Sequence, residues 1–172
     1  MISMPAMIER AARLNPGGIA THYAGRQHNW QQVRDRVASL GAALGGYGLG
    51  EGDRVAILSL NNDRFYESVF AIPWAGYCVV PLNTRWALPE NQYALSDSGT
   101  RILLFDDNFA SQAEQLLSAV ESLDSAIYMG DGQCPEWAAS YEDLVDQHDP
   151  VPASHRGGGE MAGIFYTGGT TG

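Results

Sequence analysis

The residues with the clearest chemical potential lie near the carboxyl end of the sequence, where glycines are mixed with threonines. Residues 167–172 read Thr-Gly-Gly-Thr-Thr-Gly, and they follow the apolar run 161–166. Glycine lets a backbone approach a ligand closely, while threonine hydroxyls and bare amide N–H groups donate hydrogen bonds to anionic oxygens. A strand that feeds such a loop is suited to binding a polyphosphate. On local composition alone, an ordinary surface turn is the alternative.

Two other glycine-rich stretches do not fit a nucleotide-binding motif. Residues 45–52 precede a predicted strand, whereas a dinucleotide fingerprint follows a strand, and Glu51 stands where the fingerprint needs its third glycine. The glycines at 157–159 are not followed by Gly-Lys-Ser/Thr, so they do not form a Walker loop. These mismatches disfavour a Rossmann-type oxidoreductase. We interpret the two stretches as a helix terminator and a linker.

The charge balance limits the classes of partner. The chain has 20 acidic and 10 basic residues, which gives a formal net charge of −10, and every basic residue is an arginine. Nucleic-acid binding needs clustered cations, so we expect no nucleic-acid partner. Without a lysine, the chain cannot complete by itself a mechanism that needs a catalytic or phosphate-binding lysine.

We assign no catalytic and no metal-ligating residue from the sequence. Asp106 and Asp107 follow a predicted strand, and we interpret them as a solvated strand end because no partner ligands lie at a recognisable spacing. Cys78 lies in an apolar run and is expected to be a buried small hydrophobe. The histidines lack metal-ligand spacing, and we expect them at surface or turn positions: His22, His28, His148 and His155.

The sequence shows no feature of export or membrane insertion. No apolar run approaches the length of about 18 residues that a transmembrane helix needs. The first residues alternate charged with apolar side chains and lack a signal-peptide core. The two cysteines lie in dissimilar settings and do not suggest a disulfide framework. We therefore expect a cytoplasmic protein without a transmembrane segment.

Alternating strand and helix patterns predict the fold class. Apolar runs with little alternation are typical of buried parallel strands, and these are residues 54–60, 78–82, 101–105, 126–129 and 161–166. Helical spacing and capping residues predict helices at 7–14, 30–44, 63–72, 89–97, 109–120 and 141–145. Residues 19–24 and 27–30 are expected to pair as a hairpin. The chain is thus predicted to be α/β, with a layered, mostly parallel sheet and helices on both faces.

We divide the sequence into three segments. Residues 1–147 are predicted to form an N-terminal α/β subdomain. Residues 148–160 contain two prolines and a glycine run, and we interpret them as a flexible linker over the surface. Residues 161–172 are expected to form a strand and a truncated phosphate-binding loop. Because such a loop is normally held from both sides, we expect the chain to be part of a larger enzyme.

Residues 166–172 resemble the phosphate-binding loop of the adenylate-forming superfamily, which includes acyl- and aryl-CoA synthetases, peptide-synthetase adenylation domains and firefly luciferase. Further stretches resemble the family in order along the chain, at residues 8–16, 30–44, 52–58, 76–86 and 89–99. The resemblance therefore covers nearly the whole chain, but only the front part of the family's length. Agreement at several ordered positions is more specific than one loop.

The sequence departs from the family pattern at particular positions. Gly168 stands where many members have serine, although glycine is familiar there among fatty-acyl-CoA ligases. Leu88 replaces the polar cap usual before the Pro-Glu pair, which should weaken that helix start modestly. The family's following Pro-Lys-Gly, its adenine- and acyl-binding motifs, its metal-binding glutamate and its C-terminal catalytic lysine are missing.

The resemblance implies the N-terminal part of an ATP-dependent acyl-CoA synthetase. Such an enzyme joins a carboxylic acid to ATP, releases pyrophosphate, and transfers the acyl group to CoA. It implies ATP, Mg²⁺ and CoA for the full-length enzyme, with a fatty acid favoured by the run 83–86 and by Gly168. The residues expected to hold the β- and γ-phosphates are Thr167, Gly168, Gly169, Thr170, Thr171 and Gly172. Phe165 and Tyr166 would anchor the base of the loop in the core.

We also expect consequences of a partial chain. The isolated 172 residues should be catalytically inert, residues 167–172 should be mobile or misplaced, and bare apolar faces should favour a homo-oligomer. A non-catalytic interaction module derived from a truncated ligase is the alternative. A reading frame that continues past codon 172 with Pro-Lys-Gly-like residues would favour the enzyme.

Overall fold

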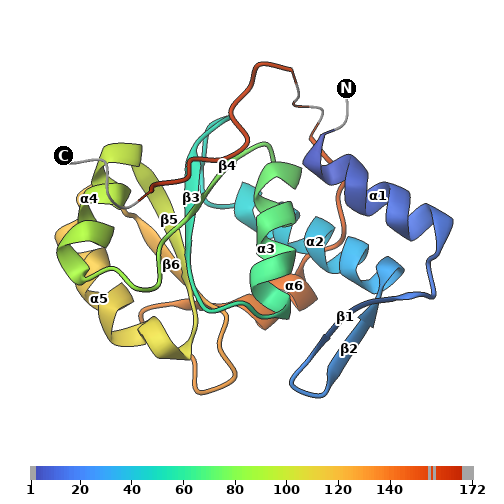
Figure 1. Cartoon of the computed structure of the whole chain (residues 1–172), viewed down its shortest axis with the longest axis horizontal. Helices are drawn as coiled ribbons and strands as arrows, with labels where there is room; N and C mark the ends of the chain where they lie inside the picture. The colour runs from blue at the N-terminus through green and yellow to red at the C-terminus, as the bar shows by residue number, and fades with distance from the viewer. Residues whose placement is uncertain (1–2, 155, 157, 168–172) are drawn as a thin grey trace.

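A five-stranded parallel sheet forms the centre of the computed structural model, which describes residues 3–154, 156 and 158–167 (Figure 1). From one edge to the other the strands are β4 (Cys78–Pro81), β3 (Arg54–Leu58), β5 (Thr100–Phe105), β6 (Ser125–Tyr128) and β7 (Ala139–Ser140), and each neighbouring pair is parallel. The chain moves from β3 to β4 and then back across β3 to β5, so the sheet is doubly wound. The predicted α/β class is confirmed, and only the two-residue β7 is too short to have been recognised.

Helices cover both faces of this sheet (Figure 1). One face is covered by α1 (Met4–Leu14), α2 (Trp30–Gly45), α3 (Asp63–Trp74) and α6 (Tyr141–Gln147), and the other by α4 (Leu88–Ser98) and α5 (Ala110–Ala119). Within β3, Val55 and Ile57 join the first core cluster, whereas Ala56 and Leu58 join the second. Because successive strand side chains point to opposite faces, a continuous apolar run buries both sides of the strand.

Capping residues explain where the helices begin and end. The capping box predicted for α2 is confirmed, since Asn29 Oδ1 accepts from the Gln32 amide at 2.8 Å and Gln32 Oε1 accepts from the Asn29 amide at 2.9 Å. At α4 the cap position is Ala87 rather than Leu88, and only the Glu90 carboxylate, 2.7 Å from the Ala87 amide, supports it. Gly99 ends α4 with φ 60°, the left-handed conformation that favours glycine.

The predicted hairpin is confirmed as a separate two-stranded antiparallel sheet. It consists of β1 (Ile19–Tyr23) and β2 (Arg26–Asn29). Both turn residues have positive φ, 46° at Ala24 and 80° at Gly25. The hairpin contacts α2 and α3 rather than the central sheet, so it adds to the helical layer on that face.

The strand predicted at residues 161–166 is wrong as a regular strand. Only Gly163 forms a bridge, parallel to Val79 on the outer edge of β4. The Val79 amide donates to the Ala162 carbonyl at 3.1 Å, and the Ile164 amide donates to the Val79 carbonyl at 2.9 Å. The next donor on this edge of β4 would be residue 81, which is a proline without an N–H. The ladder therefore stops after one step.

Residues 148–154 pass the carboxyl end of α3 without forming a helix or strand. The indole Nε1 of Trp74 donates to the Val151 carbonyl at 2.9 Å, and the Ser154 amide donates to the Trp74 carbonyl at 2.7 Å. Trp74 itself is fully buried. This segment is therefore attached to a rigid core residue, and the division at 1–147, 148–160 and 161–172 stays a prediction.

Within the described part of the chain, no helix is both long enough and apolar enough to cross a bilayer. Cys78 and Cys134 are free thiols. Cys78 is fully buried, as expected, and burial raises the pKa of its thiol. This thiol is therefore a packing group rather than a nucleophile.

Candidate functional site

The predicted phosphate-binding residues lie mostly outside the described residues. Thr167 is described and exposed. Gly168, Gly169, Thr170, Thr171 and Gly172 lie outside the described residues, so their role stays a prediction. The described residues that lead into the predicted loop are 162–167, which we call the entry segment.

Gly163 sets how closely the entry segment approaches the sheet. A Cβ atom at this position would lie 3.1 Å from the Val79 carbonyl oxygen and 2.9 Å from the Phe165 ring. The first distance is tighter than most real Cβ contacts, and the second would force the Phe165 ring to shift. Glycine at position 163 thus suits the close approach of the two backbones at the bridge to Val79.

The side chains that follow Gly163 alternate between the protein interior and solvent. Ile164 and Tyr166 pack against the core cluster beneath α4, which includes Ala94 and Leu95. Phe165 points away, and its side chain is 71% exposed. The expectation that Phe165 anchors the base of the loop is therefore wrong, since alternation along an extended chain sends neighbouring side chains to opposite sides. Tyr166 does pack against the core.

Tyr166 also makes a polar contact with α4. Its hydroxyl donates to Asp97 Oδ2 at 2.6 Å. Burial, together with the hydrogen bond to the Asp97 carboxylate, raises the pKa of Tyr166 to about 12. The hydroxyl is thus protonated at neutral pH and remains a donor. This contact holds the chain one residue before Thr167.

A buried aspartate lies at the switch point of the sheet. Doubly wound sheets commonly bind ligands beyond the carboxyl ends of the strands where the strand order reverses, which here lies between β3 and β5. Asp106 fills this position and is 4% exposed. Its carboxylate accepts from Ser59 Oγ and the Leu60 amide, both at 2.8 Å, and from the Asn108 amide at 2.8 Å. These bonds link the loops after β3 and β5.

The interpretation of Asp106 and Asp107 as a solvated strand end is wrong for Asp106. Asp107 is exposed, as expected for a solvated strand end, but Asp106 is buried because its oxygens replace water at three donors. Among residues 3–154, 156 and 158–167, no group of three or more histidine, cysteine, aspartate or glutamate side chains is arranged to hold a metal ion. A short apolar strand followed by Asp-Asp-Asn was the available signal for an inward-facing capping aspartate.

A second polar region lies where the hairpin meets α2, α3 and α6. We call it the charged cluster, and its members are Arg26, Arg36, Arg64, Asp63, Glu67, Asp131 and Glu142. The guanidinium of Arg36 contacts both Glu67, at 2.9 Å, and Glu142, at 2.9 Å. Arg64 contacts Glu142 at 2.6 Å and Asp131 at 2.8 Å. The arginines are thus neutralised by carboxylates of the protein, which makes this cluster structural rather than an anion site.

His28 approaches the same cluster. Its side chain is 19% exposed, and Nδ1 lies 3.5 Å from Glu67 Oε1. The expected surface position is therefore wrong for His28, which is partly enclosed because its ring faces Glu67 of α3 from strand β2. Glu67 is fully buried and also accepts from the Tyr141 hydroxyl at 2.8 Å.

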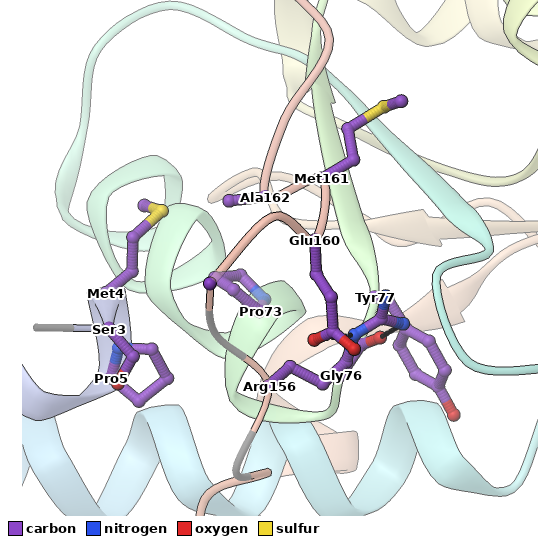
Figure 2. A pocket seen from close by; sticks show the side chains of 11 residues that line it. Ser3, Met4, Pro5, Pro73, Gly76, Tyr77, Arg156, Glu160, Met161 and Ala162 are labelled. Atoms are coloured by element: carbon purple, nitrogen blue, oxygen red, sulfur yellow. Dashed lines mark hydrogen bonds and ion pairs between the residues drawn. The ribbon is translucent and has the colours of Figure 1, made fainter. Parts of the chain in front are cut away.

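A pocket of about 160 Å³ lies near the start of β4 (Figure 2). Its lining mixes Met4, Met161 and Tyr77 with the Arg156–Glu160 ion pair. Arg156 also donates to the Gly76 carbonyl at 3.0 Å. The guanidinium is thus engaged within the protein. Neither Tyr166 nor Thr167 lines this pocket, so we assign it no part in the candidate site.

Known proteins resemble this chain in sequence and in fold. A Long-chain-fatty-acid--CoA ligase of Thermus thermophilus is 32% identical over 170 residues, which are 96% of this chain but 31% of the relative. The crystal structure of the anthranilate CoA ligase AuaEII in complex with anthranoyl-AMP superposes with a TM-score of 0.92 at 25% identity, over 99% of this chain and 33% of that one. The N-terminal domain of FACL13 from Mycobacterium tuberculosis shares the fold, with a TM-score of 0.85 at 23% identity over 97% and 42% of the two chains.

The chain thus spans about a third of the length of the relatives it matches. The sequence model of the family described as AMP-binding enzyme matches residues 8–172, which include the whole predicted loop. The chain therefore belongs to the AMP-binding enzyme family.

Proposed function

We propose that the chain is the N-terminal part of an ATP-dependent acyl-CoA synthetase, and that residues 167–172 hold the β- and γ-phosphates of ATP. The observation that carries this proposal is the family match, which continues through the glycine–threonine loop to residue 172. The likeness to a ligase in complex with an acyl-adenylate supports it.

The reaction explains why this composition suits the loop. A carboxylate attacks the α-phosphorus of ATP to form acyl-AMP and pyrophosphate, and a CoA thiol then displaces AMP to form the thioester. The first step needs the triphosphate oriented in line and the charge of the departing pyrophosphate stabilised. Backbone amides and threonine hydroxyls of residues 167–172 would donate to those phosphate oxygens. The core packing of Ile164 and Tyr166 would fix where the loop begins.

We propose a carboxylic acid substrate, with a fatty acid as the first candidate. The similar Thermus thermophilus protein is a long-chain-fatty-acid ligase, whereas the similar solved structure is an anthranilate ligase. An aryl acid is therefore the direct competitor. A panel of fatty and aryl acids, assayed by thioester formation, separates the two.

The described residues do not provide a ligand cluster for Mg²⁺. In the proposed enzyme the ATP phosphates and residues outside this chain would hold it. Nucleotide affinity of the chain with and without Mg²⁺ tests whether its own residues contribute.

Pyrophosphate release with ATP, Mg²⁺ and a panel of carboxylic acids tests the proposal. We expect turnover in the protein that continues past residue 172, and none in the isolated 172 residues, which contain no lysine. Thr170→Val in the longer protein should lower kcat/KM for ATP about tenfold or more, since it removes a hydroxyl donor from the leaving group. Ser111→Ala, on the exposed side of α5, is the matched control. Equal loss in both variants would contradict the assignment.

A non-catalytic interaction module is the competing proposal. A stop codon directly after residue 172, with a stable 172-residue product in cells, would support this module and refute the ligase. The cytoplasmic location and the homo-oligomer stay predictions; fractionation tests the first and light scattering the second.

A further inference from the structure

The entry segment has few attachments to the sheet. Two backbone hydrogen bonds join it to Val79, and Pro81 cannot donate the bond that would come next. Farther along, the polar contact nearest to Thr167 that the structure describes is the Tyr166 hydroxyl on Asp97. This bond joins the last but one described residue to α4, and the described chain ends beside that helix (Figure 1). Its position suits a contact that sets the direction of the following loop.

Asp97 is placed on a rigid support. It lies in the last turn of α4, next to the buried Ser98, whose hydroxyl is 2.7 Å from the Ala94 carbonyl. Gly99 then ends the helix. The acceptor is therefore fixed by a packed helix rather than by a loop.

The location of Asp97 is unfavourable for the helix itself. The carboxyl end of a helix carries partial negative charge, so an acidic side chain there is destabilising. The last turn of α4 contains no basic residue to offset it. The Tyr166 hydroxyl offers a donor to this carboxylate. The contact thus gives Asp97 a role that helix stability does not explain.

The chemistry of the pair keeps the bond intact at neutral pH. Burial first, and then the hydrogen bond to Asp97, raise the pKa of Tyr166 to about 12. Of the two other nearby groups, Tyr93 also raises this pKa and Ser98 lowers it. A phenol bound to a carboxylate makes a charge-assisted hydrogen bond, which is stronger than a neutral one. Tyr166 is therefore a constant donor across the physiological range.

We propose that Tyr166 is a positioning residue for the glycine–threonine loop, and that its hydroxyl bond to Asp97 fixes the chain against α4 just before Thr167. The inference rests on the proposed function, because it assigns the contact to the ATP phosphates that residues 167–172 would hold. Tyr166 acts through the loop and does not itself touch ATP.

Hydrogen exchange in the 172-residue chain tests the contact without any assay of function. Tyr166→Phe keeps the packed ring and removes the hydroxyl, so the amides of residues 164–167 should exchange about tenfold faster, the effect of losing one hydrogen bond to a charged group. Asp97→Ala should match it. Asp97→Asn should fall between, because an amide oxygen still accepts but carries no charge.

Tyr93→Phe is the matched control, since it makes the same change on α4, the helix that carries Asp97, at a residue that is 65% exposed. We expect its exchange rates to equal those of the wild type. In Asp97→Ala, the pKa of Tyr166, followed by tyrosinate absorbance, should fall from about 12 towards the ordinary value of about 10. Equal exchange in wild type and Tyr166→Phe would overturn the proposal, as would equally accelerated exchange in Tyr93→Phe.

Activity in the longer protein tests the functional half. Tyr166→Phe should raise KM for ATP about tenfold in adenylate formation, and KM for CoA should not change. Faster exchange with an unchanged KM for ATP would overturn the role in nucleotide positioning. A wild-type protein without ATP-dependent thioester formation would instead refute the proposed function. The exchange data would still decide whether the hydrogen bond between Tyr166 and Asp97 holds the entry segment.

Discussion

The charged cluster joins four elements at once, whereas the entry segment is held by the edge of one short strand and by one helix. Glu67 alone contacts Arg36, Tyr141 and His28, which lie on α2, α6 and the hairpin. The entry segment forms one bridge to β4 and one side-chain bond to α4. The two regions therefore differ in how many independent contacts would have to break before the chain could move.

This difference indicates where function and stability lie in the molecule. Residues that hold a ligand must often adjust to it, and such segments are drawn from the less stable parts of a fold. A cluster of paired charges enclosed by several elements instead holds those elements in one arrangement. Separating a pair leaves a buried charge without a partner, which destabilises the fold. We expect changes in the charged cluster to affect global unfolding, and changes in the entry segment to affect local opening.

The largest effect is expected from Glu67→Ala. The substitution leaves Arg36 and the Tyr141 hydroxyl without their buried acceptor, which should lower the free energy of unfolding by about 3–5 kcal/mol. Urea denaturation followed by circular dichroism measures this loss. Glu114→Ala, on the exposed side of α5, is the control and should change it by less than about 0.5 kcal/mol. A similar small effect at Glu67 would contradict the comparison.

The next effect depends on pH and involves Asp63. Burial opposes its ionisation, but hydrogen bonds from Arg26 and the charges of Arg26 and Arg64 hold the pKa below its ordinary value. A lowered pKa means that the carboxylate stabilises the fold above about pH 4, and that this stability is lost as the pH falls through the folded-state pKa. Asp63→Asn should therefore cost about 2 kcal/mol at pH 7.

The cost of Asp63→Asn should shrink as the pH falls below about 4, because the wild-type aspartate also becomes neutral. Urea denaturation of both proteins between pH 7 and pH 3 measures the trend. Asp146→Asn, at an exposed position on α6, is the matched control. A cost that is constant with pH would show that the charge of Asp63 is not what stabilises the cluster.

Much of this comparison could be predicted from the sequence, and its gaps have physical causes. Local signals placed the capping box at Asn29 and the buried run of β3, because caps and periodicity depend on neighbouring residues. The charged cluster could not be predicted, since Arg36 and Glu142 lie 106 positions apart and meet only in the fold. The strand at 161–166 failed for a related reason, because its pairing depends on Pro81 in another strand.

A smaller and local effect is expected from Gly163→Ala. The new Cβ would crowd the Val79 carbonyl and the Phe165 ring, which should weaken the single bridge by about 1–2 kcal/mol. Hydrogen exchange at Ile164 should accelerate, whereas the midpoint of global urea unfolding should change little. Gly159→Ala is the matched control, because no atom lies within 4 Å of a Cβ there. A large shift in the global midpoint would place the entry segment in the same cooperative unit as the charged cluster.

The smallest effect is a gain at the start of α4. Ala87 occupies the cap position without a side-chain acceptor, and only Glu90 supplies half of a capping box. Ala87→Ser should supply a hydroxyl acceptor and raise the free energy of unfolding by about 0.5–1 kcal/mol. Because α4 carries Asp97, a firmer helix should also slow hydrogen exchange at Tyr166 if the two are coupled. Thermal unfolding measures the gain in the helix, and hydrogen exchange at Tyr166 measures any gain transmitted to the entry segment. Ala87→Gly, which adds no hydroxyl, is the variant for comparison.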